Sequence, residues 1–183
     1  MMIGAPVGSV ELLWLDREVA ESDFATMHMK PGILHGSVFL DEFEPSYEIE
    51  HMDEPDNAHR FARLAVLYGW AFADDHQYLY RRSSPHLVAS VDHDYFLFGA
   101  PEWDPATLLE APAAEPDKVI VEGAFLSREV VALSAEVLKG VESDAIADAV
   151  ALLPASWGVG LDERVALASY FEKRRRQLLD AVR

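Results

Sequence analysis

The chain has 183 residues, of which 50% are hydrophobic and 26% are charged, a composition typical of an ordinary globular protein. Its 32 acidic residues outnumber 15 basic ones and give a formal net charge of -17, which repels nucleic-acid phosphates and anionic membrane surfaces. The absence of cysteine excludes disulfides, thiolate nucleophiles and cysteine-ligated metal centres.

The ends of the chain carry no recognisable targeting pattern. The N-terminal residues lack a basic stretch followed by a long apolar run, so we expect no secretory signal peptide. No apolar run approaches the roughly 20 residues that a membrane helix requires. We therefore expect a cytoplasmic protein whose partners include neither membrane nor nucleic acid.

The first third of the chain shows little helical periodicity. Residues 7–15 are rich in strand-forming side chains and precede the polar residues 16–18, which predicts a strand followed by a short helix or turn. Residues 29–54 contain glycines and prolines and few periodic apolar positions. We expect them to be mostly loop, with a short strand at residues 37–40.

A helix and a hairpin are predicted next. Apolar residues recur at steps of three and four between Asp56 and Asp74, which predicts an amphipathic helix capped by Asp56 or Asn57. Residues 78–80 and 86–91 alternate in the manner of strands around a turn. They predict an antiparallel hairpin.

The remainder is predicted to be helical after a proline-containing surface connection at residues 102–117. Ser127, Ser143 and Asp162 are the expected N-caps of three helices. The arginine run 174–176 is expected to be a solvated face near a helix C-terminus. The apolar stripe of the last helix is expected to comprise Val165, Ala168, Phe171, Leu178 and Val182. The pattern as a whole predicts one α+β unit over residues 1–183, mainly helical with a small antiparallel hairpin.

Two polar clusters flank the predicted hairpin, at residues 74–77 and 92–94. If the strands pair as expected, Asp75 and Asp92 lie within several ångströms of each other. Two close carboxylates repel unless a cation or a proton lies between them, and with the amide of Gln77 they form an oxygen-rich set suited to Mg²⁺. The alternative, favoured by these considerations alone, is that the first cluster ends its helix in solvent while Asp92 accepts backbone hydrogen bonds.

Other chemistry-bearing residues give weaker indications. His76 and His93 adjoin the acids and His35 lies in the loop-rich segment, but no HxH or HxxxH spacing supports a zinc site. Ser37 follows His35 closely, yet no G-x-S-x-G elbow is present, so a Ser-His hydrolase is weakly supported. Phosphate-binding and dinucleotide-binding glycine motifs are absent from the sequence. The four tryptophans are expected to pack in the core.

The segments "GWAFADDHQYLY" and "SVDHDYFLFGAPEW" carry a family resemblance. The chain resembles the HipA-like kinases, in particular a small bacterial branch whose members carry "GW…DHQ" followed by "SVDHG…F..G..W". The resemblance covers residues 3–183 and is most specific at residues 69–77 and 90–103. It implies a kinase-like fold in which residues 55–183 form the C-terminal lobe and residues 1–54 form a residual N-terminal lobe, hinge and loop-rich segment.

The resemblance also implies an activity, transfer of the γ-phosphoryl group of ATP to a protein serine or threonine with Mg²⁺. It places Asp75 in the catalytic role on the attacking hydroxyl, with Asp74 as an alternative. Gln77 and Asp92 take the roles of metal ligands. His35 and Ser37 are the candidate cofactor-binding residues, the cofactors being Mg²⁺ and ATP.

The chain departs from the family pattern in two ways. Asp94 stands where the family has glycine, and the phosphate-covering loop and strand-borne lysine are missing, Lys30 being the only lysine before Lys118. Three hypotheses follow. The first is a HipA-like kinase with a reduced N-terminal lobe. The second is a catalytically inactive relative that binds another protein through its acidic cleft or surface, with self-association or a partner expected where the missing lobe leaves apolar surface uncovered. The third is another phosphate-handling or hydrolytic enzyme that uses the same acids with His35 or His93.

Overall fold

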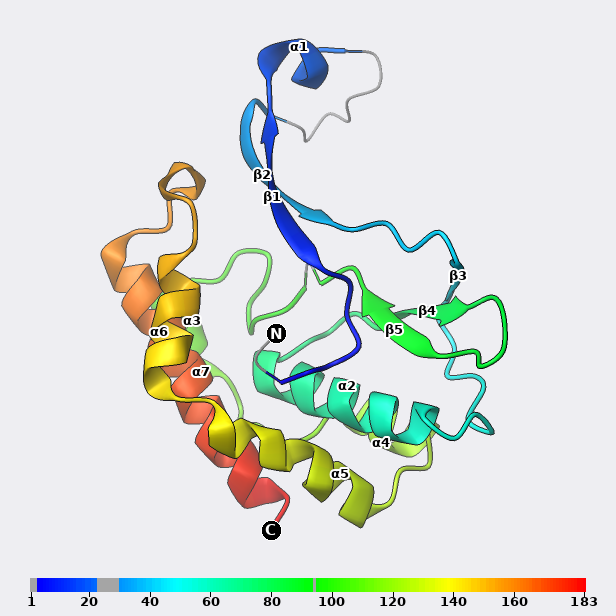
Figure 1. Ribbon diagram of the computed structural model, residues 1–183. Helices are drawn as coiled ribbons and strands as arrows, with labels where there is room; N and C mark the ends of the chain where they lie inside the picture. The colour runs from blue at the N-terminus through cyan, green and yellow to red at the C-terminus, as the bar shows by residue number, and fades with distance from the viewer. Residues whose placement is uncertain (1–2, 23–29, 94) are drawn as a thin grey trace.

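The computed structural model describes residues 3–22, 30–93 and 95–183 (Figure 1). Within these residues the chain is α+β, with seven α-helices, a two-stranded antiparallel ribbon and a three-stranded antiparallel sheet. The mixed class and the predominance of helix confirm the prediction at that level. Among the described helices, none is long and apolar enough to cross a membrane.

The ribbon consists of β1 (Val10–Leu15) and β2 (Gly32–Ser37), and it projects from the body of the protein (Figure 1). At its far end lies α1 (Arg17–Ala20), where the Asp16 side chain accepts a hydrogen bond from the Val19 amide at 2.9 Å. Asp16 therefore caps this short helix. The strand predicted within residues 7–15 is confirmed from Val10 onward, and the short helix or turn predicted after it is a helix.

The prediction that residues 29–54 are mostly loop with one short strand is confirmed in part: most of the described residues 30–54 lie outside strands, but two strands form there and neither covers the expected range. β2 pairs along its whole length with β1. The backbone of β1 therefore stabilises β2 as a strand, although the sequence of β2 alone does not predict one. The short strand expected at residues 37–40 is displaced toward the N-terminus. A further strand, β3 (Phe43–Ser46), forms on the edge of the three-stranded sheet, where its Pro45 is tolerated.

The three-stranded sheet has the order β3, β4 (Gln77–Arg81), β5 (Val88–Val91). Gln77 lies opposite Val91, and Tyr80 lies opposite Val88. This is the register expected for the hairpin, and it brings the two polar clusters to the same end of the sheet.

The central helix α2 (Asn57–Ala71) confirms the predicted amphipathic helix. Asp56 occupies the N-cap position but its side chain makes no capping hydrogen bond. Asn57 is fully buried and donates through Nδ2 to the carbonyl oxygens of His51 and His86, both at 2.9 Å. It thereby ties the start of the helix to the loop before it and to the hairpin.

The chain continues through short helices to one long one: α3 (Pro105–Glu110), α4 (Lys118–Gly123), α5 (Arg128–Ala135), the 3₁₀ segment η1 (Glu136–Gly140), α6 (Ser143–Ala151), the 3₁₀ segment η2 (Ala155–Trp157) and α7 (Leu161–Ala181). The connection at residues 102–117 thus contains a helix that was not expected. Its first turn is capped by Asp104, which accepts from the Thr107 amide at 2.7 Å.

The predicted helix starts are confirmed to within a residue or two. Ser127 caps α5 as expected. Glu142, not Ser143, is the N-cap residue of α6. The N-cap residue of α7 is Gly160 instead of Asp162, because the Glu163 carboxylate accepts a hydrogen bond from the Gly160 amide at 2.6 Å and closes that turn earlier.

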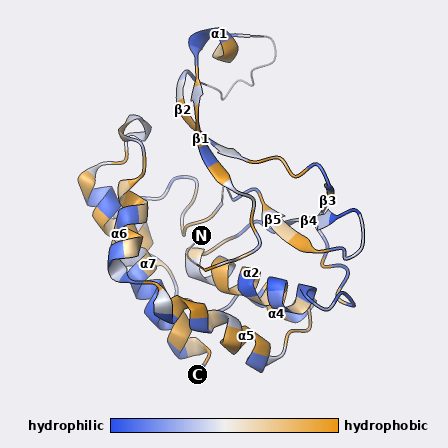
Figure 2. Ribbon diagram, in the orientation of Figure 1, coloured by the Kyte–Doolittle hydropathy of each residue, from blue (hydrophilic) through white to orange (hydrophobic). Residues whose placement is uncertain are grey.

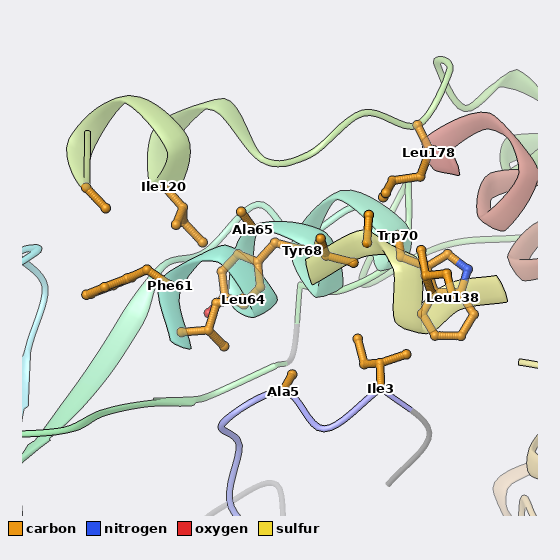
Figure 3. Close-up of a cluster of buried hydrophobic side chains, with 14 of the residues drawn as sticks. Ile3, Ala5, Phe61, Leu64, Ala65, Tyr68, Trp70, Ile120, Leu138 and Leu178 are labelled. Carbon is orange, nitrogen blue, oxygen red and sulfur yellow. The ribbon is translucent and has the colours of Figure 1, made fainter. Parts of the chain in front are cut away.

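The main core surrounds α2, which packs against α4, α5, α7 and β5 (Figure 3). Fully buried side chains of α2 include Phe61, Leu64 and Tyr68. Ile3 and Ala5, from the N-terminal segment, cover the same helix. A smaller cluster lies between α3, α6 and α7.

The predicted stripe of α7 is confirmed in part, because Leu178 is buried and Ala168, Phe171 and Val182 pack against the core. Val165 is 57% exposed, whereas Leu167, Tyr170, Arg174 and Leu178 are buried. The prediction that the arginine run is a solvated face is therefore wrong for Arg174, which is 3% exposed. A charged residue on the buried face breaks the apolar periodicity from which the stripe was inferred.

Arg174 binds the C-terminal end of α2. Its Nε and Nη2 donate to the carbonyl oxygens of Trp70 and Gly69 at 2.8 and 2.6 Å, and its Nη1 donates to Pro112 O at 2.9 Å. The guanidinium also lies 5.4 Å from the ring centre of Phe72. Burial lowers the pKa of Arg174 from its ordinary value. The cation satisfies carbonyl groups that a helix end leaves unpaired, at the negative end of the helix dipole.

The tryptophans do not all pack in the core. Trp70 is buried and donates through Nε1 to Phe171 O at 2.8 Å. Trp157 reaches across to the ribbon and donates to Ile33 O at 2.7 Å. Trp14 is 74% exposed on β1, so core packing was wrong for it. The hydropathy colouring shows apolar positions along the same ribbon (Figure 2).

Replacing Arg174 by methionine is expected to lower the free energy of unfolding by about 3 kcal/mol, because buried carbonyl groups lose charge-assisted hydrogen bonds. Urea denaturation measures the change. Lys173→Met is the matched control, since Lys173 is the exposed neighbour on the same helix. An equal effect of the two substitutions would contradict the capping role.

Glu172 gives a second prediction. Hydrogen bonds from Arg175, then from Arg176, lower the pKa of the Glu172 carboxyl to about 2, below its ordinary value of 4.5. A carboxyl with a lowered folded-state pKa stabilises the protein above its unfolded pKa, and this contribution disappears as the pH falls through the folded value. We expect wild type to exceed Glu172→Gln in thermal stability at pH 6 to 7 (roughly neutral), with the gap closing progressively between about pH 4.5 and about pH 2. A gap that does not change with pH would refute this assignment.

Candidate functional site

The structure brings Asp75, Gln77 and Asp92 together at the end of the hairpin. The Gln77 amide nitrogen donates to Asp75 Oδ2 at 2.8 Å and to Asp92 Oδ2 at 3.1 Å. One amide therefore bridges the two carboxylates that the hairpin register was expected to bring close. Asp74 is exposed and takes no part in this bridge, so the geometry favours Asp75 over Asp74 as the site acid.

Backbone pairing between the two clusters holds the acids in place. Ala73 forms an antiparallel bridge with Phe96, and the amide of Leu97 donates to Ala71 O at 3.1 Å. The chain after Asp92 thus turns back and pairs with the chain before Asp75. Both carboxylates are consequently fixed by the same short piece of backbone as well as by the hairpin.

Left-handed backbone occurs at both approaches to the site. Phe72, directly after α2, has φ 65°, and Asp92 has φ 55°. Aspartate adopts this conformation more readily than most residues other than glycine, whereas phenylalanine does not. The turn at Phe72 ends α2 and directs the chain toward Asp75.

A buried polar chain lies under the site. The Tyr68 hydroxyl and Ser90 Oγ are 2.6 Å apart, and Ser90 Oγ is 2.9 Å from His93 Nε2. The backbone of Gln77 also hydrogen-bonds to Tyr68, and burial raises the pKa of this tyrosine to about 12. Tyr68 therefore remains a neutral hydroxyl that connects α2 to both strands of the hairpin.

The hydrogen bonds among Tyr68, Ser90 and His93 were not predicted from the sequence. The periodicity of the predicted helix places Tyr68 among its apolar positions, and it does not indicate which partner the buried hydroxyl of a tyrosine would require. Ser90 and His93 form the Ser-His pair of the structure, in place of His35 and Ser37. Ser90 is fully buried, however, so its hydroxyl is not accessible to a substrate.

His76 points away from the acids. Its Nε2 lies 3.1 Å from Asp117 Oδ1, and the same oxygen accepts the Ile120 amide at 2.8 Å, capping α4. Asp117 is a second polar partner that the sequence did not suggest. His76 thus joins the site segment to α4 and is not part of the Asp75 and Asp92 set.

His35 and Ser37 are placed on β2, where both are exposed. In the part of the chain that the structure describes, no hydrogen bond joins either residue to the acids or to Gln77. Asp94, the departure from the family pattern, lies outside the described residues.

The chemistry of the site is that of two carboxylates and one amide. Neither Asp75 nor Asp92 forms an ion pair with a described residue, so their negative charges are offset only by hydrogen bonds. No cluster of three or more histidine or acidic side chains suited to a metal occurs among the described residues. A hard cation here would take at most three protein side chains and keep water or phosphate oxygens, the pattern that Mg²⁺ prefers.

No family model, no curated protein and no solved structure matches the chain.

Tyr68→Phe tests the buried polar chain. Loss of the hydroxyl leaves the ring in place but removes the hydrogen bond to buried Ser90, which we expect to lower the free energy of unfolding by about 1–2 kcal/mol. Chemical denaturation checks this. Tyr95→Phe, on a half-exposed tyrosine nearby, serves as the control, and an unchanged stability of the Tyr68 variant would show that the chain contributes nothing.

Proposed function

We propose that the chain is a HipA-like, kinase-type domain that binds Mg²⁺ and ATP through Asp75, Gln77 and Asp92 and transfers phosphate to a protein serine or threonine. The convergence of these three side chains carries the proposal, because the family resemblance assigns roles to the same three residues. The register of the hairpin, which sets their spacing, supports it further.

Each residue has a distinct role in this proposal. Bound Mg²⁺ would neutralise phosphate oxygens, with Asp92 and the oxygen of Gln77 as its protein ligands. To bind the cation, the amide of Gln77 would have to turn over, so that its oxygen instead of its nitrogen faces the cation beside Asp92. The Asp75 carboxylate is then released from its amide donor and accepts the proton of the attacking hydroxyl.

The negative charge of the site makes nucleotide binding dependent on a bound cation. The two carboxylates repel a polyphosphate, and neither is paired with a described arginine or lysine. Charge-assisted contacts from a strand-borne lysine or a phosphate-covering glycine loop are worth roughly 1.5–3 kcal/mol each, and neither feature is recognisable in the sequence. Nucleotide binding at this site is therefore expected to depend strictly on the cation.

A second candidate function is favoured by the ribbon. Leu12, Leu13 and Trp14 are half exposed or more, and Phe39 beyond β2 is 85% exposed. Exposed large apolar side chains gathered on one ribbon are typical of a protein-binding surface. The alternative is thus a catalytically inactive kinase-derived module whose ribbon binds another protein, and the net charge of -17 favours a basic partner over a second copy.

Thermal unfolding with ligands decides between the two. With Mg²⁺ and ATP at millimolar concentration we expect the midpoint of wild type to rise, because a ligand that binds only the folded state stabilises it, by about 2.7 kcal/mol at a hundredfold excess over Kd. ATP with EDTA is expected to give no rise. Asp92→Asn should abolish the response, whereas Asp74→Asn, an exposed acid outside the bridge, should retain it.

The failing outcomes are distinct. A wild type that does not respond to Mg²⁺ and ATP removes nucleotide binding and leaves the protein-binding alternative. If the Asp74 and Asp92 variants lose the midpoint shift equally, the shift depends on the overall negative charge of the protein and not on the proposed site. Phosphate transfer to a serine-containing protein is measured by mass spectrometry. A rise in the midpoint without such transfer refutes the kinase activity but retains the binding site.

A further inference from the structure

A second pocket lies at the other end of α2, between its first turns and the N-terminal segment. Its volume is about 450 Å³, and it shares no residue with the site of Asp75, Gln77 and Asp92. The residues that line it are Gly4, Ala5, Pro6, Asp56, His59, Arg60 and Arg63. It is thus a concave region rich in cationic and potentially cationic side chains on a strongly acidic protein.

The backbone of the N-terminal segment holds Arg63 in the pocket. The Nη1 group donates to Ile3 O and Gly4 O, both at 3.2 Å. Gly4 has φ +59°, a conformation that glycine adopts without strain, and a Cβ at this position would lie 2.5 Å from Arg63 Nη1. Ile3 and Ala5, on either side, are buried against α2 (Figure 3). The position of this guanidinium is therefore set by a well-anchored segment.

Arg60 is anchored by one edge only. Its Nε donates to Val88 O at 2.7 Å, and its terminal nitrogens have no hydrogen-bond partner among the described residues. Burial lowers the pKa of Arg60, and Asp56 acts in the opposite direction. A partly desolvated cation whose outer edge lacks a partner gains most from a bound anion.

The charges of the two arginines are not neutralised by ion pairs with other described residues. Within the described residues neither forms an ion pair, whereas most of the remaining basic side chains do so: Arg17, Arg81, Lys118, Lys139, Arg175, Arg176 and Arg183. The N-terminal end of α2, a helix of 15 residues, adds the positive end of its dipole. The single acid of the pocket, Asp56, is exposed at the helix start.

From this geometry we propose that the pocket of His59, Arg60 and Arg63 binds a phosphate group. Guanidinium groups match the oxygens of phosphate through paired N–H donors. Two guanidinium groups therefore bind a phosphate dianion more tightly than a singly charged carboxylate ligand. The volume exceeds that of inorganic phosphate, so a phosphate monoester fits the same chemistry. The proposal does not depend on the proposed kinase activity, since it involves neither Mg²⁺ nor the acids.

Isothermal titration calorimetry with the full chain tests the site. Inorganic phosphate is titrated in EDTA at constant ionic strength, with O-phosphoserine and acetate as parallel ligands. We expect saturable binding of phosphate and of phosphoserine, and binding of acetate that is weaker by about tenfold or more. Arg63→Gln should weaken phosphate binding by at least about tenfold, which corresponds to about 1.4 kcal/mol.

Arg82→Gln is the matched control, because Arg82 is an exposed arginine outside the pocket and its loss changes the net charge equally. It should bind phosphate like wild type. Arg63→Lys, which keeps the charge but loses the fork of donors, should give an intermediate affinity and replaces Arg63→Gln if that variant does not fold. Binding that is unsaturable in wild type, or equally weakened in the Arg82 variant, would overturn the proposal.

Binding that survives in Asp92→Asn distinguishes this site from the proposed nucleotide site. If phosphate binding fails while the Mg²⁺-dependent response to ATP persists, only the second pocket is refuted. If phosphate binds in EDTA and ATP gives no response with Mg²⁺, only the nucleotide site is refuted. Equal affinity for phosphate and acetate would overturn the assignment to phosphate.

Discussion

The position of one buried cation determines how the rest of the structure is arranged. Arg174 of α7 satisfies the last carbonyl groups of α2, and the indole of Trp70 returns a hydrogen bond to the backbone of α7. The two longest helices are therefore joined by polar contacts inside an apolar core, where unpaired groups are costly. Because α2 ends at this contact, the chain leaves it at Phe72 in a fixed direction and enters the acidic site.

The same helix connects three regions that are separate in sequence. Asn57 binds the loop before the helix and the hairpin, Arg63 binds the N-terminal segment, and Tyr68 binds β5 through Ser90. Each contact uses a polar side chain on a helix whose other inward positions are apolar. The helix thus provides both the centre of the core and the support of the candidate site and the second pocket, so a change of its position would alter both.

Periodic patterns made α2, the hairpin and the later helices predictable, and the hairpin register in turn predicted that Asp75 and Asp92 approach each other. The structure goes beyond sequence where a residue's role depends on a distant partner. β2 forms because β1 pairs with it, and Arg174 is buried because it meets the end of a helix about a hundred residues earlier in the chain. Local patterns carry no trace of such long-range contacts. The amide bridge by Gln77 and the hydrogen-bond chain of Tyr68 belong to the same class, and neither was foreseen.

The bridge formed by Gln77 also has a consequence for observing the site. The amide has no proton that titrates near neutral pH, yet it has two faces, one that donates and one that accepts. Between the two carboxylates it presents its nitrogen. A bound cation would require its oxygen instead. The side-chain NH₂ resonances of this single residue therefore register which charge lies between the acids, independently of any turnover. Gln77 thus serves as a built-in spectroscopic probe of the candidate site.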